Sequence, residues 1–289
     1  MGMKLRFLPI LLLPVLALSL ISCGTNTALN NAGAGLLFVT AEANTTISSF
    51  VVNLNNGVLT ANGDSVGTGG GPAAIAIAPS LDALFVANST ANSISSYSIS
   101  SFGGLTEISG TTPVGTTPMG LAIDPAGKFL FVANEGSSSI SVFSISGTTL
   151  TAVPGSPFTT VPVGYTFPDG TLPVAVAVSN TGSFLYVANQ LTNFVSAFGI
   201  NPGNGALTPL PIPFYTEVQG SSPSGLGISP NGGSLYVMNF PSEDFLQDYL
   251  KTEPYIVGDV WRTVDIHKSN TRDPWQFNRP QEWFQSREN

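Results

Sequence analysis

The sequence predicts an all-β protein built from repeated four-stranded antiparallel units, because two spacings recur along it without slipping. Four times a proline is followed thirteen residues later by an aromatic residue, and a second aromatic follows the first three of these after twelve residues. Each first aromatic opens a short phrase, FVAN twice, then YVAN and YVMN. Repeats 46 to 55 residues apart indicate stacked or radially arranged units. The pairs are Pro72 and Phe85, Pro118 and Phe131, Pro173 and Tyr186, and Pro223 and Tyr236; the second aromatics are Tyr97, Phe143 and Phe198.

One repeat, beginning at Pro118, shows what each unit encodes. Strands are expected at Met119–Ile123, Phe129–Ala133, Ile140–Phe143 and Leu150–Val153, because these runs are rich in apolar, β-branched and aromatic residues separated by turn residues. Four short antiparallel strands in about 40 to 50 residues form one blade of a β-propeller. A two-sheet sandwich is the alternative, but it has no reason to hold two fixed spacings over several copies.

The strand after each proline is expected to be the innermost one. Ala73–Ile77 and Val174–Val178 consist almost entirely of small and aliphatic residues, which suits a strand covered on both faces near an axis. Asn56-Gly57, Gly103-Gly104 and Asn204-Gly205 predict tight hairpins between the third and fourth strands, because these residues favour positive φ. A partial copy with Phe38 and Phe50 precedes the others, so between four and five blades are encoded.

The repeated phrases resemble the YVTN-type repeats of the seven-bladed β-propeller lactonase family, which includes bacterial 6-phosphogluconolactonase-like proteins. The resemblance covers about residues 36–240, which we assign to a partial β-propeller. It implies the fold directly. It implies hydrolysis of a sugar lactone only as a family possibility, because many propellers with these repeats have no assigned reaction.

The first 35 residues predict an exported, anchored protein. Lys4 and Arg6 precede the apolar run Phe7–Leu20, and Leu20-Ile21-Ser22-Cys23 follows, with Cys23 the only cysteine. A basic segment, an apolar segment of about fourteen residues and a small-residue junction form a secretory signal. The LISC sequence resembles the bacterial lipobox, which implies a signal peptide at 1–22, lipidation of Cys23, and an outer-membrane or cell-surface lipoprotein. An ordinary cleaved signal is the alternative. Residues 23–35 read as a flexible tether.

The body of the chain is almost uncharged. Residues 24–240 contain eight acidic residues and one basic residue, Lys128, with no arginine, histidine or tryptophan. Such a surface offers no cationic footprint for nucleic acid, so nucleic acid is not an expected partner. No disulfide is expected from a single cysteine.

The composition changes at Pro241. The last 49 residues carry fifteen charged side chains, all three tryptophans and the only histidine, His267. A helix is expected at Ser242–Leu250 and a strand at Val260–Ile266. From Gly233 to Ile266 the stretch resembles the end of a YciI-like α/β domain, so 241–289 is expected to be a short α/β tail of different origin. Two origins fit this junction, a gene fusion and an error of gene prediction or assembly.

Residues able to catalyse lactone opening are scarce in the body. That reaction needs a base or a metal-bound hydroxide and a stabilised oxyanion, and a phosphorylated substrate needs cationic contacts. The resemblance implies histidine where the chain begins the innermost strand, but the residues there are Ala73, Met119, Val174 and Ser224. Lys128 is expected to be a solvated turn residue. His267 has no evident partner and is expected to be structural.

The remaining polar candidates point to structure rather than chemistry. The carboxylates stand singly, without the spacing of a calcium loop, so no metal site or cofactor is expected. Four asparagines recur at one position and are expected to hold a strand end by bonding to backbone, with a ring of ligand-binding amides as the alternative. Seven of the eight carboxylates are Glu42, Asp82, Glu107, Asp124, Glu135, Asp169 and Glu217; the asparagines are Asn88, Asn134, Asn189 and Asn239.

Two functions from different classes follow. The first is a non-catalytic, lipid-anchored propeller that binds a protein or glycan partner at the cell envelope. The second is a 6-phosphogluconolactonase-like hydrolase. The residues predict no catalytic site, and the lack of histidine and arginine in the body favours the binding protein.

Overall fold

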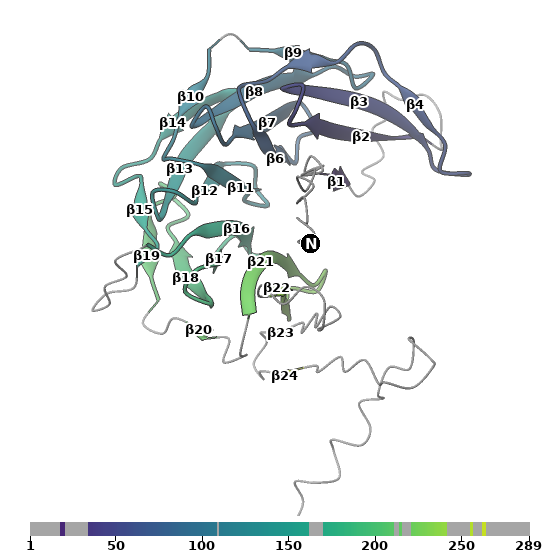
Figure 1. Ribbon diagram of the computed structural model, residues 1–289. Coiled ribbons are helices and arrows are strands. Elements are labelled where there is room, and N and C mark those ends of the chain that lie inside the picture. Colours follow the sequence, from purple (N-terminus) through teal and green to yellow (C-terminus); the bar gives the residue numbers. More distant parts are fainter. Residues whose placement is uncertain are drawn as a thin grey trace, which may run out of the picture.

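The computed structural model describes residues 34–108, 110–161, 170–210 and 221–241, together with four two- or three-residue strands outside these ranges. All regular structure in this part of the chain is β-strand, and the sheets are antiparallel. The sheets are arranged in sequence order around an open arc (Figure 1). The predicted all-β propeller is therefore confirmed.

Four blades have all their strands and each follows the same plan, but the inner strand of the first blade, β1 (Leu18–Leu20), lies within residues 1–22, the segment expected to be the signal peptide. In three of them the first strand starts at the recurring proline, the second strand pairs with the first, and the third strand pairs with the second. The first blade contains β1 (Leu18–Leu20), β2 (Ala34–Ala41), β3 (Thr46–Asn53), β4 (Leu59–Ala61) and β5 (Val66–Gly67). The second contains β6 (Pro72–Ile77), β7 (Ala83–Asn88), β8 (Ser93–Ile99), β9 (Leu105–Glu107) and β10 (Thr112–Pro113). The third contains β11 (Pro118–Ile123), β12 (Phe129–Asn134), β13 (Ser139–Ser146), β14 (Thr149–Ala152) and β15 (Phe158–Thr159). The fourth contains β16 (Pro173–Val178), β17 (Phe184–Asn189), β18 (Phe194–Ile200), β19 (Leu207–Pro209) and β20 (Phe214–Tyr215).

The outermost strand of every blade is interrupted, which the sequence analysis did not anticipate. In the third blade both β14 and β15 pair with β13, and the other three blades repeat this arrangement. In the third blade Pro154 and Pro157 lie between β14 and β15 and cannot donate to a ladder. The side chain of Ser156 accepts a hydrogen bond from the Val142 amide at 2.9 Å, in place of a backbone carbonyl.

The innermost strands lie side by side, as predicted. β11 contacts β6 on one side and β16 on the other, and β16 also contacts β21 (Figure 1). Their small side chains are required by this proximity: a Cβ added to Gly120 would stand 2.8 Å from the carbonyl oxygen of Val174 in the next blade. Ala, Val and Gly allow such an approach between backbones near an axis.

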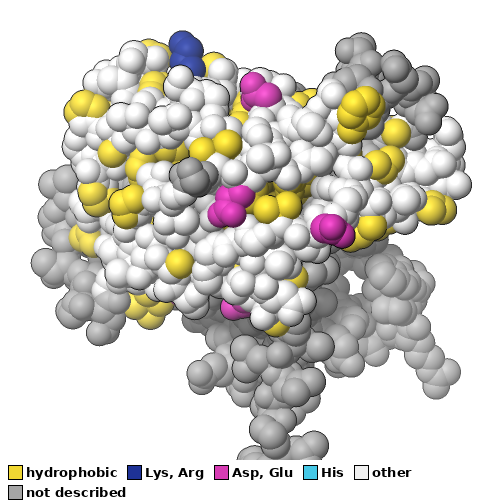
Figure 2. Space-filling view, turned by 90° about the horizontal axis from the view of Figure 1, so that it is seen from above, with side chains coloured by type: hydrophobic (Ala, Val, Ile, Leu, Met, Phe, Trp, Pro, Cys, Tyr) yellow, Lys and Arg dark blue, Asp and Glu magenta, His cyan; other side chains and the backbone are white. Residues whose placement is uncertain are grey.

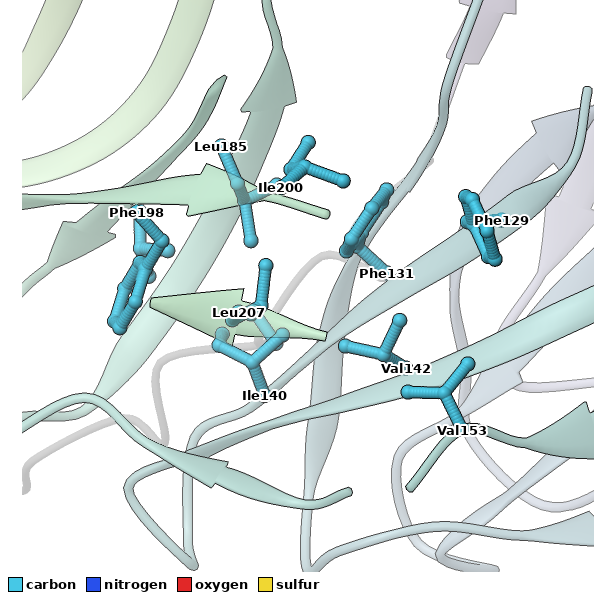
Figure 3. Packing of buried hydrophobic residues seen from close by; sticks show 11 residues of the cluster. Phe129, Phe131, Ile140, Val142, Val153, Leu185, Phe198, Ile200 and Leu207 are labelled. Atoms are coloured by element: carbon cyan, nitrogen blue, oxygen red, sulfur yellow. The ribbon is translucent and has the colours of Figure 1, made fainter. Parts of the chain in front are cut away.

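The recurring aromatic residues fill the spaces between blades. Phe131 is fully buried and packs with Leu185 and Val187 of the following blade (Figure 3). Phe85 is fully buried against Leu130 and Val132 in the same way. The thirteen-residue spacing therefore places an aromatic side chain in the interface between the second and third blades and in the interface between the third and fourth.

The last sheet is half a blade. β21 (Ser221–Ile228) pairs with β22 (Leu235–Pro241), and one face of β22 packs on the fourth blade through Leu235 and Val237. On the other face Tyr236 is 41% exposed and Met238 is 59% exposed. Tyr236 occupies the repeat position of Phe131, so its exposure follows from the lack of a described blade beyond it. The described blades number four and a half, within the predicted range.

The predicted hairpins are also present. Gly57, Gly103 and Gly205 have φ values of 75°, 81° and 74°. At Gly103 the space is limiting as well, because an added Cβ would lie 2.3 Å from a methyl carbon of Leu36.

Several predictions fall on residues outside the described ones. These are the signal segment apart from β1, Cys23, Asp169, Glu217, the helix at 242–250, and His267. β2 begins at Ala34, two residues inside the segment expected to be a tether. Beyond Pro241 only β23 (Tyr255–Ile256) and β24 (Arg262–Thr263), which pair with each other, are assigned. The part of the chain that the structure describes contains no apolar helix long enough to cross a membrane.

Candidate functional site

One end of the propeller is built from the loops that lead to the innermost strands, and we call it the proline face. It comprises the approach loops 68–71, 114–117 and 170–172, and the turns 89–92, 135–138 and 190–193, which connect the second and third strands. Each turn donates backbone hydrogen bonds to the approach loop of its own blade: Ser89 N to Gly71 O at 2.6 Å, Glu135 N to Thr117 O at 2.9 Å, and Gln190 N to Leu172 O at 2.9 Å.

Side chains on this face also join neighbouring blades. The Asn92 side-chain oxygen accepts a hydrogen bond from the Thr117 amide of the next blade at 2.8 Å. The Ser138 hydroxyl does the same for the Thr171 amide at 3.0 Å. Because these bonds fix each approach loop to two blades, the proline face presents a pre-organised surface rather than independent loops.

Backbone strain accompanies these contacts. Asn92, Ser138 and Asn193 have φ between 48° and 57°, and so do Thr117 and Leu172, directly before the prolines. Positive φ is tolerated by asparagine but is sterically unfavourable for a β-branched residue such as Thr117. The hydrogen bond from the Thr117 amide to Asn92 helps to hold this conformation.

The four residues that follow the prolines stand at a register shift. The first strand of the second, third and fourth blades and of the final half blade pairs with the strand that follows it. In each of these four pairs the register shifts between the proline and the second residue after it. Ala73, Met119, Val174 and Ser224 are therefore the bulged residues, and all four are half-buried. Ser224 donates to the Met238 carbonyl at 3.3 Å. None of these side chains is a base or a cation.

Glu135 is the residue of this face best suited to act as a general acid or base. It stands in the turn of the third blade on the proline face and is half-buried, and burial raises the pKa of its carboxyl group. A raised pKa is a property of carboxyl groups that act as general acids or bases, although structural burial has the same effect. Glu135 was among the carboxylates considered from the sequence, but its burial could not be predicted from the residues around it. Glu42, in the corresponding turn of the first blade, is exposed.

Asp124 lies at the opposite end and is a structural residue. Asp124 is only 5% exposed, a burial that the residues of its turn do not reveal. Its carboxylate accepts hydrogen bonds from the amides of Ala126, Lys128 and Phe129 at 3.1, 2.6 and 2.6 Å, and so closes the turn between β11 and β12. Lys128 itself is exposed, as predicted.

Three of the four recurring asparagines bond to serines, which corrects the expected side-chain-to-backbone pattern, and the Asn239 side chain has no hydrogen-bond partner among the described residues. Asn134 donates to the hydroxyls of Ser139 and Ser141 at 3.2 and 2.9 Å, and Asn88 donates to two serines of β8 in the same way. Asn189 alone combines both patterns, donating to Ser196 and to two backbone carbonyls. The alternating Ser-x-Ser pattern of the third strand was the signal that could have identified these partners.

These asparagines are not available to a ligand. Asn88, Asn134 and Asn189 are fully buried, and Asn239 is 8% exposed. Their side-chain oxygens lie inside the blades with no hydrogen-bond partner. A Cβ added to Gly69 would stand 2.6 Å from the Asn88 side chain, so the approach loop covers that residue directly.

The surface is polar but nearly free of charge. Figure 2 shows few acidic side chains and one basic side chain among mostly uncharged atoms. Across residues 34–241 the only lysine or arginine is Lys128, and there is no histidine. No three carboxylate, cysteine or histidine side chains gather into a metal-binding group among the described residues. Hydroxyl and amide groups of this kind can hydrogen-bond to a neutral, hydroxyl-rich ligand, but they supply no charge-assisted contact for phosphate.

Comparison with protein families gives one match. Residues 31–156 and 155–245 match the model of a family described as lactonase, 7-bladed beta-propeller. No curated protein matches the chain.

Solved structures share the fold at low sequence identity. A protein from Lactobacillus plantarum superposes with a TM-score of 0.64 and 22% identity, over 80% of this chain and 67% of that one. A candidate 6-phosphogluconolactonase from Bacteroides fragilis gives 0.63 and 20%, over 83% and 71% of the two chains. A periplasmic gluconolactonase from Pseudomonas aeruginosa gives 0.55 and 20%, over 79% and 69%. At these identities the likeness shows the fold alone.

Proposed function

This chain belongs to the lactonase family of seven-bladed β-propellers, and we propose that it acts as a non-catalytic binding protein anchored at the cell envelope. Its ligand is a neutral, hydroxyl-rich molecule, such as a glycan, or a protein segment of similar polarity. The binding surface is the proline face.

One observation carries this proposal. At the four positions that follow the prolines, where the family resemblance implies histidine, the chain has Ala73, Met119, Val174 and Ser224, and none of these is a base or a cation. The hydroxyl groups and backbone amides of the approach loops remain, and their cross-blade hydrogen bonds hold them in fixed positions. Such a surface suits recognition by hydrogen bonding rather than proton transfer.

The anchor is proposed at Cys23. The basic, apolar and LISC segments occur in the order of a lipoprotein signal. Acyl chains on the cysteine would hold the propeller at the outer membrane or the cell surface, since each buried methylene contributes about 0.8 kcal/mol and two or more chains anchor stably. A fatty-acid probe should label the wild-type protein and leave Cys23→Ser unlabelled. Equal labelling of the two proteins would refute the anchor.

Binding at the proline face can be tested with neutral oligosaccharides of the cell envelope by calorimetry. Thr116 is exposed on this face, so Thr116→Trp should block the surface and weaken binding. Thr149 is also exposed but lies at the other end of the blade, and Thr149→Trp should leave the affinity unchanged. If both substitutions act alike, or if no neutral glycan binds, the proposed surface is wrong.

Lactone hydrolysis is the second candidate function, and one observation favours it. The half-buried Glu135 has a raised pKa and stands on the proline face, where a general base would be needed. Two structural neighbours carry names that refer to gluconolactone chemistry. If the wild-type protein hydrolyses a lactone and Glu135→Gln does not, the protein is a hydrolase and not a binding protein alone.

A further inference from the structure

Two neighbouring hairpins break the polar pattern that their counterparts keep. The hairpin between β3 and β4 carries Leu54 and Val58, which are 49% and 55% exposed, and Leu59 beside them is 50% exposed. The hairpin between β8 and β9 carries Phe102, which is 66% exposed. In the third and fourth blades the same positions are Ser146–Thr149 and Asn201–Ala206, with no large apolar residue. Turns ordinarily select small polar residues, so large exposed apolar side chains at two tips call for an explanation.

The two apolar tips are held together. The Asn62 side chain, beside β4, donates a hydrogen bond to the Phe102 carbonyl at 2.8 Å. Gly103 lies so close to Leu36 of β2 that an added Cβ would overlap it, and Leu54 in turn lies 3.3 Å from the Cβ position of Gly35. Because these contacts fix the second hairpin against the first blade, the tips project from one edge of the molecule. Figure 2 shows exposed apolar side chains at the right of the molecule, on the side where β3 and β4 lie in Figure 1, as well as others spread over the rest of this face.

The path of the chain places this edge next to the proposed anchor. Ala34, the first residue of β2, pairs with Asn53, the residue before Leu54. Only ten residues, 24–33, separate Cys23 from Ala34. Ten extended residues span at most about 36 Å, so acyl chains on Cys23 would keep this edge within that distance of the bilayer surface.

The charges at this end do not oppose contact with lipid. In the described turns at this end, the exposed charged residues of the second and third blades are Asp82 and Lys128, one of each sign, and the buried Asp124 is enclosed by backbone amides. The first two blades also carry the exposed Asp64 and Glu107, which lie along their outer strands and not in the hairpins. Neither hairpin tip carries a charge. Apolar side chains with uncharged neighbours can enter the boundary between headgroups and acyl chains without burying an unpaired charge.

We propose that Leu54, Val58, Leu59 and Phe102 form a membrane-docking edge that inserts into the lipid bilayer beside the Cys23 anchor. The edge fixes the orientation of the propeller and leaves the proline face, at the opposite end of the blades, directed away from the membrane. This inference rests on the proposed lipid anchor, and it adds a second, weaker point of membrane contact.

A thiol label tests the insertion directly. Cys23 is the only cysteine, and in the lipoprotein its sulfur is alkylated, so Phe102→Cys introduces a single free thiol for an environment-sensitive dye. The full-length lipidated protein is placed in vesicles of phosphatidylethanolamine and phosphatidylglycerol. Leu191→Cys is the matched control, because Leu191 is 46% exposed but belongs to a turn of the proline face.

The dye at position 102 should emit at shorter wavelength in vesicles and be quenched several-fold less by an aqueous quencher, because inserted side chains lie roughly 5–10 Å below the headgroups. The dye at position 191 should keep its aqueous spectrum. If the acyl group is present and both dyes remain in water, the docking edge is wrong. Mass spectrometry showing no acyl group on Cys23 would refute the anchor and this orientation together. A blue shift at position 102 without vesicles, rising with protein concentration, would assign the edge to contact between copies instead.

Discussion

Replacing Phe131 and Tyr236 by alanine compares one repeat position with and without a following blade. Phe131 is fully buried between the third and fourth blades, whereas Tyr236 is 41% exposed on the last described strand. Removing a fully buried phenylalanine costs about 3–5 kcal/mol, since the transfer free energy of the ring is lost and a cavity remains.

The cost at Tyr236 should be smaller. Full burial of a large apolar side chain contributes about 1.5–3 kcal/mol, and only the buried part of Tyr236 contributes, so Tyr236→Ala should cost about 1–2 kcal/mol with little cavity. Urea unfolding followed by circular dichroism measures both values. The difference of about 2–3 kcal/mol corresponds to a gap in Tm of roughly 4–12 °C, at 2–4 °C per kcal/mol. Equal losses would refute the reasoning, because they would mean that the outer face of β22 is packed like an interface between blades.

Three further predictions concern titratable residues. Burial raises the pKa of Tyr97 from 10.0 to about 12. The stability that its neutral form contributes is therefore complete below pH 10 and is lost as the pH rises from 10 towards 12. Tyr97→Phe should remove this loss, so the free energy of unfolding of the variant should change less over this pH range. Burial also raises the pKa of Glu135, so the stability contributed by its neutral form is lost as the pH rises above about 4.3, the pKa of glutamate in the unfolded chain. In urea titrations Glu135→Gln should therefore be more stable than the wild type at about pH 7 and equal to it at about pH 3.5. Asp124→Ala leaves three backbone amides without their acceptor and should lower the free energy of unfolding by about 3 kcal/mol, whereas a loss below about 1 kcal/mol would show that water replaces the carboxylate.

The repeat spacing predicted the blades because it records geometry that every blade must share. The proline marks the start of the innermost strand, and the aromatic thirteen residues later falls in the interface with the next blade, as Phe85 and Phe131 do. Glycines in the hairpins were predictable for the same reason, since the backbone there needs positive φ.

The interrupted outer strands and the serine partners of the asparagines were not predicted. Both depend on which groups meet across a sheet. Ser156 replaces a backbone acceptor for Val142, and Ser139 lies opposite Asn134 only once β12 and β13 are in register. At the candidate site, the residues after the prolines could be located from the sequence. The burial of Glu135 and Asp124 could not, because it is set by loops and amides that come together only in the fold.

Turnover of 6-phosphogluconolactone by the purified, folded protein tests the central claim most directly, with uncharged gluconolactone as a second substrate. If the protein only binds its ligand, lactone should disappear at the uncatalysed rate, because no base stands at the four positions after the prolines. The Glu135→Gln variant should give the same trace as the wild type. A rate well above the uncatalysed one that falls to background in Glu135→Gln would contradict this account and establish the chain as a lactone hydrolase.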